Sequence, residues 1–164
     1  MKYSDFIVLD GGMGTMLQAA GLPLGLLPEI WNITAPEKVT AIHREYIEAG
    51  SRVIFANTFG ANRHKTEKCG YTPAELIAGG IRAARKAAEG TDVKVALDIG
   101  PIGQLLEPLG NLSFEEAYEI FREMVTAGAE AGADLIVFET MSDLHELKAA
   151  VLAAKENTDL PVWA

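Results

Sequence analysis

The stretch that decides the fold reads Phe6-Ile7-Val8-Leu9-Asp10-Gly11-Gly12-Met13-Gly14-Thr15. Four apolar residues run into an aspartate, three glycines follow within four positions, and a helical pattern begins at Thr15. An uninterrupted apolar run is typical of a strand buried on both faces of a parallel sheet. An acid at the carboxyl end of such a strand lies where parallel α/β folds bind ligands. The stretch therefore predicts a strand that ends in a small-molecule site. The alternative is a plain strand-to-helix turn with Asp10 as a cap.

Similar strand ends recur along the chain. Apolar runs at 53–56, 93–97 and 135–138 are followed by Asn57, Asp98 and Glu139, which lie about 41 residues apart. This period fits one βα unit per step and predicts a parallel sheet with right-handed crossovers. Asp10 and these three residues would then share the C-terminal rim of the sheet.

The segments between the strands carry helix signals. Thr72-x-x-Glu75 and Ser113-x-x-Glu116 have the spacing of capping boxes, and Ser142 is the expected cap of a helix that runs to about 157. Glu-Ala-Gly occurs at 48–50 and at 130–132, each time just before an apolar strand, and predicts two helix ends. Residues 22–33 are expected to form a loop, and residues 58–64 a second loop that leads into a basic, irregular segment ending near Gly70.

Four βα units and the start of a fifth strand at 161–164 fit into this chain. Because a complete (β/α)8 TIM barrel usually needs about 250 residues, we interpret residues 1–164 as the N-terminal half of such a barrel, with the C-terminal half absent. The competing architecture is an open, doubly wound sheet of five strands.

The bulk composition excludes several classes of function. The net charge of −9 argues against a nucleic-acid or anionic-membrane partner. Cys69 is the only cysteine, so an intrachain disulfide is impossible and a reducing compartment is expected. The N-terminus has no signal-peptide pattern, and no apolar run approaches the roughly 20 residues of a membrane span. These features predict a cytoplasmic protein.

The expected rim holds acids, an amide and glycine-rich turns, but no base. Acids can hold an ammonium group, whereas the N–H groups of Gly11, Gly12 and Met13 suit a carboxylate or phosphate. A rim with both features fits a zwitterion, that is, an amino acid. A dinucleotide site is disfavoured because Leu17 stands where the fingerprint needs its third glycine.

The remaining reactive side chains give weaker signals. His43 and His145 fall on predicted helices, where solvated or capping roles are expected, and surface exposure is expected for His64. Cys69 has no second cysteine or nearby histidine at ligand spacing, so no metal site is predicted on this chain.

The strand-end motifs resemble those of the homocysteine S-methyltransferase family. The matching segments are Asp10-Gly11-Gly12-Met13-Gly14-Thr15, Pro28-Glu29-Ile30-Trp31-Asn32, Ile42-His43-Arg44-Glu45-Tyr46, Asn57-Thr58-Phe59-Gly60-Ala61-Asn62, Asp98-Ile99-Gly100-Pro101 and Phe138-Glu139-Thr140. They cover essentially the whole chain in order. Within the family, the closest likeness is to the N-terminal homocysteine-binding module of cobalamin-dependent methionine synthases.

The resemblance implies a (β/α)8 barrel that binds homocysteine at its C-terminal rim and activates the thiol on zinc. Asp10 and Glu139 match acids near the substrate amino group, and the Gly11-Gly12-Met13 turn matches amides that face its carboxylate. Asn57, Thr58 and Phe59 match the rim of the second strand, and Asp98 that of the third. The three zinc-binding cysteines of the family follow later strands, so the resemblance places them outside this chain.

The expected function is therefore homocysteine binding for methyl transfer to its sulfur, which forms methionine. Cobalamin and methyltetrahydrofolate would be bound by other modules, and the chain alone is expected to be inactive. The expected partner is the remaining half of the barrel or a second copy of the chain. Two alternatives are a non-catalytic half barrel that self-associates and an open-sheet binder of a small anion at Gly11–Gly14.

Overall fold

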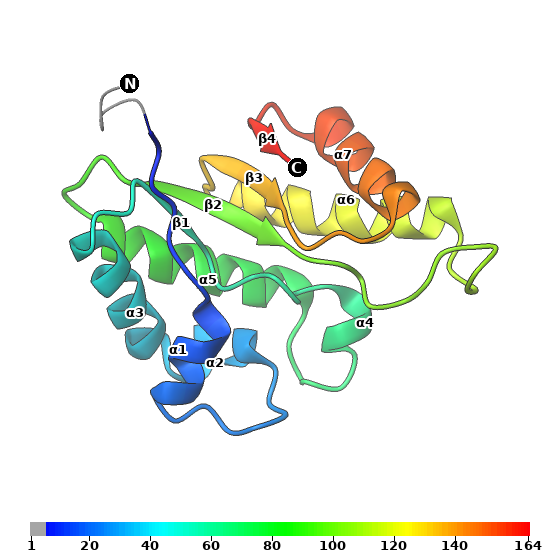
Figure 1. Ribbon diagram of the computed structural model, residues 1–164. Coiled ribbons are helices and arrows are strands. Elements are labelled where there is room, and N and C mark those ends of the chain that lie inside the picture. The colour runs from blue at the N-terminus through cyan, green and yellow to red at the C-terminus, as the bar shows by residue number, and fades with distance from the viewer. Residues whose placement is uncertain (1–5) are drawn as a thin grey trace.

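Four parallel strands with helices packed along them make up the computed structural model, which describes residues 6–164 (Figure 1). Residues 1–5, on which part of the signal-peptide reading depends, lie outside the described residues. In chain order the elements are α1 (Met13–Ala19), the 3-10 helix η2 (Pro28–Ile30), α2 (Trp31–Thr34), α3 (Pro36–Glu48), β1 (Val53–Phe55), α4 (Arg63–Thr66), α5 (Pro73–Ala88), β2 (Lys94–Ile99), α6 (Phe114–Glu130), β3 (Leu135–Phe138), α7 (Leu144–Asn157) and β4 (Val162–Trp163).

Each strand pairs in parallel with the next strand in the sequence, so the sheet order is β1-β2-β3-β4. Helices α3, α5, α6 and α7 pack against one another in the same order along one side of the sheet (Figure 1). A doubly wound sheet would reverse its strand order and carry helices on both faces. The predicted parallel α/β fold is confirmed, and the doubly wound alternative does not fit.

The strands are apolar on both faces, as their sequences predict. In β2, Val95, Leu97 and Ile99 alternate toward the helices and belong to the main core. Ala96 points the other way and packs with Val53, Leu135 and Val137 in a separate apolar cluster on the opposite face. Asp98 shares the face of Ala96, because it lies two residues further along the same strand.

Several helix boundaries follow local chemistry. The capping box at Thr72 is complete, since Thr72 Oγ1 accepts the N–H of Glu75 and the Glu75 carboxylate accepts the N–H of Thr72. At Ser113 only the first of the two bonds forms. Gly50 and Gly132 adopt φ of 106° and 91°, which explains why Glu-Ala-Gly ends two helices. Among residues 6–164, none of the helices combines the length and apolar composition needed to cross a membrane.

The opening apolar run does not form the predicted strand buried on both faces. Leu9 makes a single bridge to Val53, and the N–H of Arg52 donates to the Val8 carbonyl. The side chains of residues 6–9 remain 41–61% exposed. The run lies beside β1 on one edge only, and within the described residues no strand pairs with its other edge.

Two segments are more ordered than their sequences predict. The loop at 22–33 contains η2 and α2, and Trp31 of α2 is buried. Helix α4 replaces the end of the loop predicted at 58–64 and the start of the irregular segment that follows it, because the Asn62 side chain accepts the N–H groups of His64 and Lys65.

The predicted cap of α7 was wrong by one residue. Asp143, not Ser142, is the N-cap, and its Oδ1 accepts the His145 N–H at 2.7 Å. We expect Asp143→Ala to lower the free energy of unfolding by about 1 kcal/mol, as loss of a helix cap usually does. Ser142→Ala should change it by less than about 0.5 kcal/mol. Urea denaturation of both variants measures the difference, and equal losses would contradict the assignment.

Candidate functional site

A cavity of about 370 Å³ lies at the C-terminal ends of the strands. Its walls come from the turn before α1, the segment around η2, and the residues that follow β1, β2 and β3. The lining residues are Gly12, Met13, Gly14, Leu27, Pro28, Glu29, Asn57, Phe59, Gly60, Lys65, Asp98, Glu139 and Thr140. Six of the nine predicted site residues therefore meet in one cavity: Gly12, Met13, Asn57, Phe59, Asp98 and Glu139.

Asp98 is one of two buried acids on the cavity wall, and the other is Glu29. The Asp98 side chain is buried, and its Oδ1 has no hydrogen-bond partner among the described residues. Burial, together with the nearby charges of Glu139, Asp10 and Glu29, raises the pKa of Asp98 to about 8. At neutral pH, Asp98 is therefore mostly protonated in the absence of a cation.

The charges of Asp10 and Glu139 both act on Asp98, although Asp10 is not among the residues that line the cavity. Asp10 Oδ2 accepts the N–H of Phe55 at 2.8 Å, which fixes the carboxylate beside the end of β1. Burial raises the pKa of Asp10 to about 6, against the lowering effect of that hydrogen bond. Glu139 is half-buried and is followed by Thr140, which holds a positive φ of 59°. Such a conformation is uncommon for a β-branched residue and costs on the order of 1 kcal/mol.

Glu29 is a third acid on the cavity wall, beside Asp98 and Glu139, and was missed as a site residue. It is 2% exposed, one carboxylate oxygen accepts the Gly60 N–H, and Oε2 has no partner among residues 6–164. Burial raises the pKa of Glu29. Two buried, unpartnered carboxylate oxygens, on Glu29 and Asp98, thus belong to residues that line the same cavity.

Lys65 also lines the cavity, whereas the sequence analysis predicts no basic residue at the rim. It belongs to α4, within the segment predicted to be irregular. Its Nζ donates to the Pro101 carbonyl at 2.8 Å and lies 5.2 Å from the centre of the Phe59 ring. The prediction that no base reaches the rim was therefore wrong, because the Asn62 cap turns this segment toward the cavity.

Two predicted site residues have clear structural roles. Asn57 Nδ2 donates to Asn32 Oδ1 and to the Pro28 carbonyl, which ties the η2 segment to the end of β1. Thr58 is fully buried, outside the cavity wall, and its hydroxyl donates to the Asp98 carbonyl at 2.8 Å. These bonds leave the Asn57 amide fixed and place Thr58 behind Asp98.

Phe59 forms part of the wall because its ring lies against a glycine. A Cβ at Gly100 would stand 2.3 Å from the Phe59 ring, so only glycine leaves room for it there. The N–H of Gly100 also donates to the Phe59 carbonyl at 3.0 Å. The ring is therefore packed against Gly100, the residue that follows β2.

The glycine turn before α1 forms another part of the cavity wall. Gly12 and Met13 are on the wall, whereas Gly11 is not and packs against the Tyr46 ring. Gly12 is the N-cap of α1 and provides no side-chain cap. Acids and the backbone of this turn thus both belong to the lining of the cavity.

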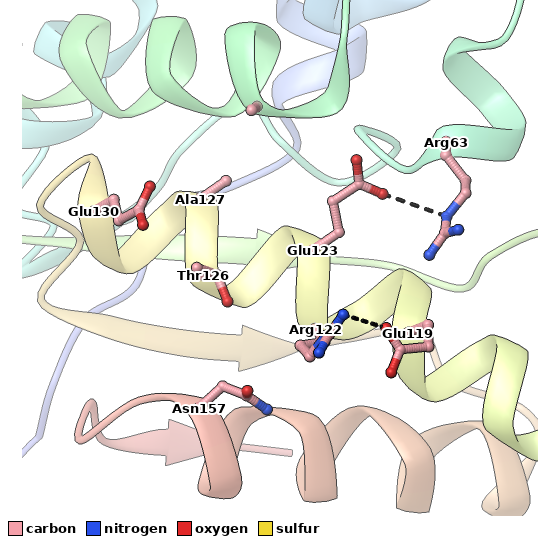
Figure 2. Close-up of a pocket in the computed structure, with 9 residues that line it drawn as sticks. Arg63, Glu119, Arg122, Glu123, Thr126, Ala127, Glu130 and Asn157 are labelled. Carbon is pink, nitrogen blue, oxygen red and sulfur yellow. Dashed lines mark ion pairs between the residues drawn. The ribbon is translucent and has the colours of Figure 1, made fainter.

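A larger hollow of about 620 Å³ lies on the outer surface of the helices, around α6 (Figure 2). Its charged residues are mostly paired with one another, as Arg63 with Glu123 at 3.3 Å and Arg122 with Glu119. None of the predicted site residues reaches it. We therefore place the candidate site in the smaller cavity at the strand ends.

The three histidines and Cys69 lie apart from this cavity. His43 is fully buried, so its predicted solvated role was wrong. His145 is exposed, and His64 is half-buried with Nδ1 3.1 Å from Gln104 Nε2. Cys69 Sγ lies 3.4 Å from the Tyr71 carbonyl.

The zinc implied by the family resemblance needs a set of converging ligands. Among residues 6–164, no three His, Cys, Asp or Glu side chains are grouped so that they could hold a metal ion. The only thiol, Cys69, contacts a backbone carbonyl instead. The described residues therefore do not fit a zinc site by themselves.

Comparison with known proteins gives one consistent result. The model of the family described as "Homocysteine S-methyltransferase" matches residues 7–164. A methionine synthase of Mycobacterium tuberculosis is 37% identical over 178 aligned residues, which cover 96% of this chain but 15% of that protein. The homocysteine S-methyltransferase of Escherichia coli is 31% identical, over 88% of this chain and 53% of that protein.

A solved structure is also similar. The metallated form of the homocysteine methyltransferase MmuM from Escherichia coli superposes with a TM-score of 0.84 at 27% identity, over 96% of this chain and 62% of that one. The chain thus spans about half of the Escherichia coli homocysteine S-methyltransferase, 62% of the MmuM structure and 15% of the methionine synthase.

Proposed function

Because the chain belongs to the homocysteine S-methyltransferase family, we propose that it forms the N-terminal, substrate-binding half of a homocysteine S-methyltransferase barrel. Its cavity binds the amino-acid part of homocysteine, whose sulfur then receives a methyl group to give methionine. The sequential parallel sheet with helices on one side and the similarity to 62% of MmuM support the half-barrel architecture.

One observation carries the proposal: buried carboxylates converge on the cavity with oxygens that lack hydrogen-bond partners. A buried polar atom without a partner costs free energy. The ammonium group of an amino acid would supply N–H donors to Asp98 and Glu29 and positive charge to Asp10 and Glu139. These residues then hold and orient the substrate, while the N–H groups of the Gly12-Met13 turn face its carboxylate.

We further propose that the intact protein is of the methionine synthase type, in which cobalamin and methyltetrahydrofolate are bound by other modules. The higher identity to the mycobacterial methionine synthase than to the Escherichia coli methyltransferase supports this assignment. The zinc that activates the thiol would be held by residues of the rest of the barrel or of a second copy of the chain. The exposed apolar edge at residues 6–9 offers a surface against which the rest of the barrel, or the second copy, could pack. Residues 1–164 alone would bind the substrate without transferring the methyl group.

Calorimetric titration of the chain tests the binding function. We expect L-homocysteine to bind with a stoichiometry of about one per chain. The matched ligand 4-mercaptobutanoate lacks only the amino group and should bind at least about a hundredfold more weakly, because the acids then have no cation to neutralise. Equal affinity for the two ligands would show that the acids do not recognise an ammonium and would overturn the proposal.

A further inference from the structure

Asn32 is buried and is hydrogen-bonded to Asn57, a residue of the cavity wall, but does not line the cavity itself. Its Nδ2 donates to the Asn57 carbonyl at 2.7 Å and to the Leu76 carbonyl of α5 at 2.9 Å. Its Oδ1 accepts Asn57 Nδ2 at 2.8 Å. Both N–H groups and the oxygen of this amide are therefore engaged within the protein, so any effect of Asn32 on a bound substrate must pass through a neighbour.

That neighbour is Glu29, which lies in the same segment and does line the cavity. The amide pair fixes the backbone on both sides of Glu29, because Asn57 Nδ2 also donates to the Pro28 carbonyl at 3.0 Å. The Glu29 carboxylate accepts the Gly60 N–H through one oxygen, and Oε2 has no partner among residues 6–164. The position of this free oxygen thus depends on where the backbone of the segment is held.

Asn32 is central to the attachment of this segment. Among residues 6–164, the hydrogen bonds that join residues 28–32 to α5 and to the residues after β1 run through three side chains, those of Glu29, Asn32 and Asn57. Trp31 packs instead in the apolar cluster that α1, α3 and α5 share. Loss of the Asn32 amide should therefore leave the segment folded but free to shift relative to the end of β1.

The surroundings of Asn32 leave it little freedom of its own. A Cβ at Gly80 of α5 would stand 2.9 Å from Asn32 Nδ2, so the helix approaches the amide closely. Because an N–H···O hydrogen bond forms only over about 2.7–3.2 Å, a shift of Glu29 by about 1 Å is enough to lose a bond to a ligand. A tightly held amide beside a free carboxylate oxygen suits a site that must present that oxygen accurately.

We propose that Asn32 is a positioning residue that holds Glu29 where its free oxygen accepts an N–H of the substrate ammonium. This inference rests on the proposed homocysteine binding and deepens it, because it names how one of the acids is kept in place. The competing role is purely structural: the pair of Asn32 and Asn57 would stabilise the fold without affecting the acid.

A double-mutant cycle separates these roles, since it measures whether two side chains act on binding together. L-Homocysteine is titrated calorimetrically into the wild-type chain, Asn32→Ala, Glu29→Gln and the double variant. Glutamine keeps an oxygen for the Gly60 N–H but removes the charge that attracts an ammonium. Thr40→Val is the matched control, because Thr40 is equally buried, also donates to a carbonyl of α5, at Ala83, and does not line the cavity. Urea denaturation verifies that each variant is folded.

We expect Glu29→Gln to weaken homocysteine binding about tenfold or more, the loss typical of a hydrogen bond to a charged group. Asn32→Ala should weaken it about tenfold, the low end of the roughly ten- to hundredfold loss that follows when the partners that orient a metal ligand are removed. In the Glu29→Gln background, Asn32→Ala should cost less than about twofold more, because the acceptor that Asn32 positions is already lost. If Asn32→Ala does not fold, Asn32→Ser, which keeps a donor for one of the two carbonyls, takes its place with the same expectation.

Losses that multiply in the double variant, an equal loss for Thr40→Val, or an unchanged affinity for Asn32→Ala would overturn the positioning role while homocysteine binding itself stands. An unchanged affinity for Glu29→Gln would also overturn it, because Asn32 would then have no ammonium contact to position. A wild-type chain that binds no homocysteine would instead overturn the proposed function, and this inference with it.

Discussion

Glu139→Gln is expected to weaken homocysteine binding about a hundredfold, a loss of about 2.7 kcal/mol. Glu139 follows β3 and lies on the cavity wall, and it is not engaged as the cap of α7, because Asp143 has that role. Its charge also acts on Asp10 and Asp98. Removing one partner of a buried ion pair costs about 3–5 kcal/mol. The expected loss is smaller because Glu139 is only half-buried.

The pH of this measurement matters because the acids interact. Removing the charge of Glu139 lowers the pKa of Asp98, so that at pH 8 a newly ionised Asp98 would replace part of the lost charge. At pH 6, burial keeps Asp98 protonated in both proteins, since its pKa in the wild type is about 8. Calorimetric titration with homocysteine at pH 6 therefore removes the response of Asp98, whereas Asp10, with a pKa of about 6, still ionises further when the charge of Glu139 is removed.

The control for Glu139→Gln is the same substitution at Glu130, an exposed residue in the last turn of α6. This change should alter homocysteine affinity by less than about twofold, because Glu130 lies outside the cavity. Glutamine keeps the shape of Glu139, so both variants should unfold like the wild type. If the two variants bound homocysteine equally well, Glu139 would be a turn residue and not part of the site.

The sequence predicted the strands and the strand-end acids well because both depend on local pattern. An apolar run of four to six residues can bury itself only in a sheet or core, and the polar residue that ends it marks the rim. The period that links Asn57, Asp98 and Glu139 therefore placed three side chains correctly on one cavity wall. The same period of about 41 residues thus predicts both the parallel strands and the residues at their C-terminal ends.

Glu29 and Lys65 escaped prediction because tertiary contacts, not local pattern, bring them to the cavity. The η2 segment reaches the site through the paired amides of Asn32 and Asn57. An acid with 2% exposure also contradicts the usual preference of glutamate for the surface. Asn62 was the available signal for α4, since asparagine ahead of Arg-His-Lys is a good helix cap.

His43 and the opening apolar run show where side-chain type misleads. His43 stands one residue after Ile42 and four after Val39, so helical spacing places it on the buried face of α3 despite its polar ring. Burial lowers its pKa to about 4, and both ring nitrogens lack partners among the described residues. Conversely, residues 6–9 are apolar but exposed, since burial on both faces requires a neighbour on each side of a strand.

The stability of the chain is expected to fall as the pH rises from 6.5 to 8, because Asp98 must ionise in a buried place. In the unfolded chain its pKa is near the ordinary 3.8, whereas in the folded chain it is about 8. Between these values the folded state holds a proton that the unfolded state has released, so the free energy of unfolding decreases with pH. This contribution is complete below pH 4 and is lost as the pH passes through 8.

Two other groups act in the acid part of this window and oppose each other. Asp10, with a pKa of about 6, adds to the decrease between pH 4 and 6. His43 is neutral in the folded chain down to about pH 4, whereas an unfolded histidine binds a proton near pH 6.5, so His43 makes stability rise with pH there. Above pH 6.5 neither Asp10 nor His43 changes the free energy of unfolding much further with pH. The range from 6.5 to 8 therefore reports on Asp98, together with any raised pKa of Glu29 or Glu146.

Asp98→Asn separates Asp98 from these other acids. Asparagine resembles the protonated carboxyl group and cannot ionise, so the variant should lose about 1.5 kcal/mol of the decrease between pH 6.5 and 8 and be more stable than the wild type at pH 8. Asp134→Asn is the matched control: it removes an ion pair with Arg85 and a bond from the Val95 N–H, which lowers stability but should leave the slope unchanged. Urea denaturation at pH 6.5, 7.25 and 8 measures all three proteins. If the wild type and Asp98→Asn showed the same slope, Asp98 would already be ionised at pH 6.5. Asp98 would then not be an acid that stays protonated in the empty cavity at neutral pH.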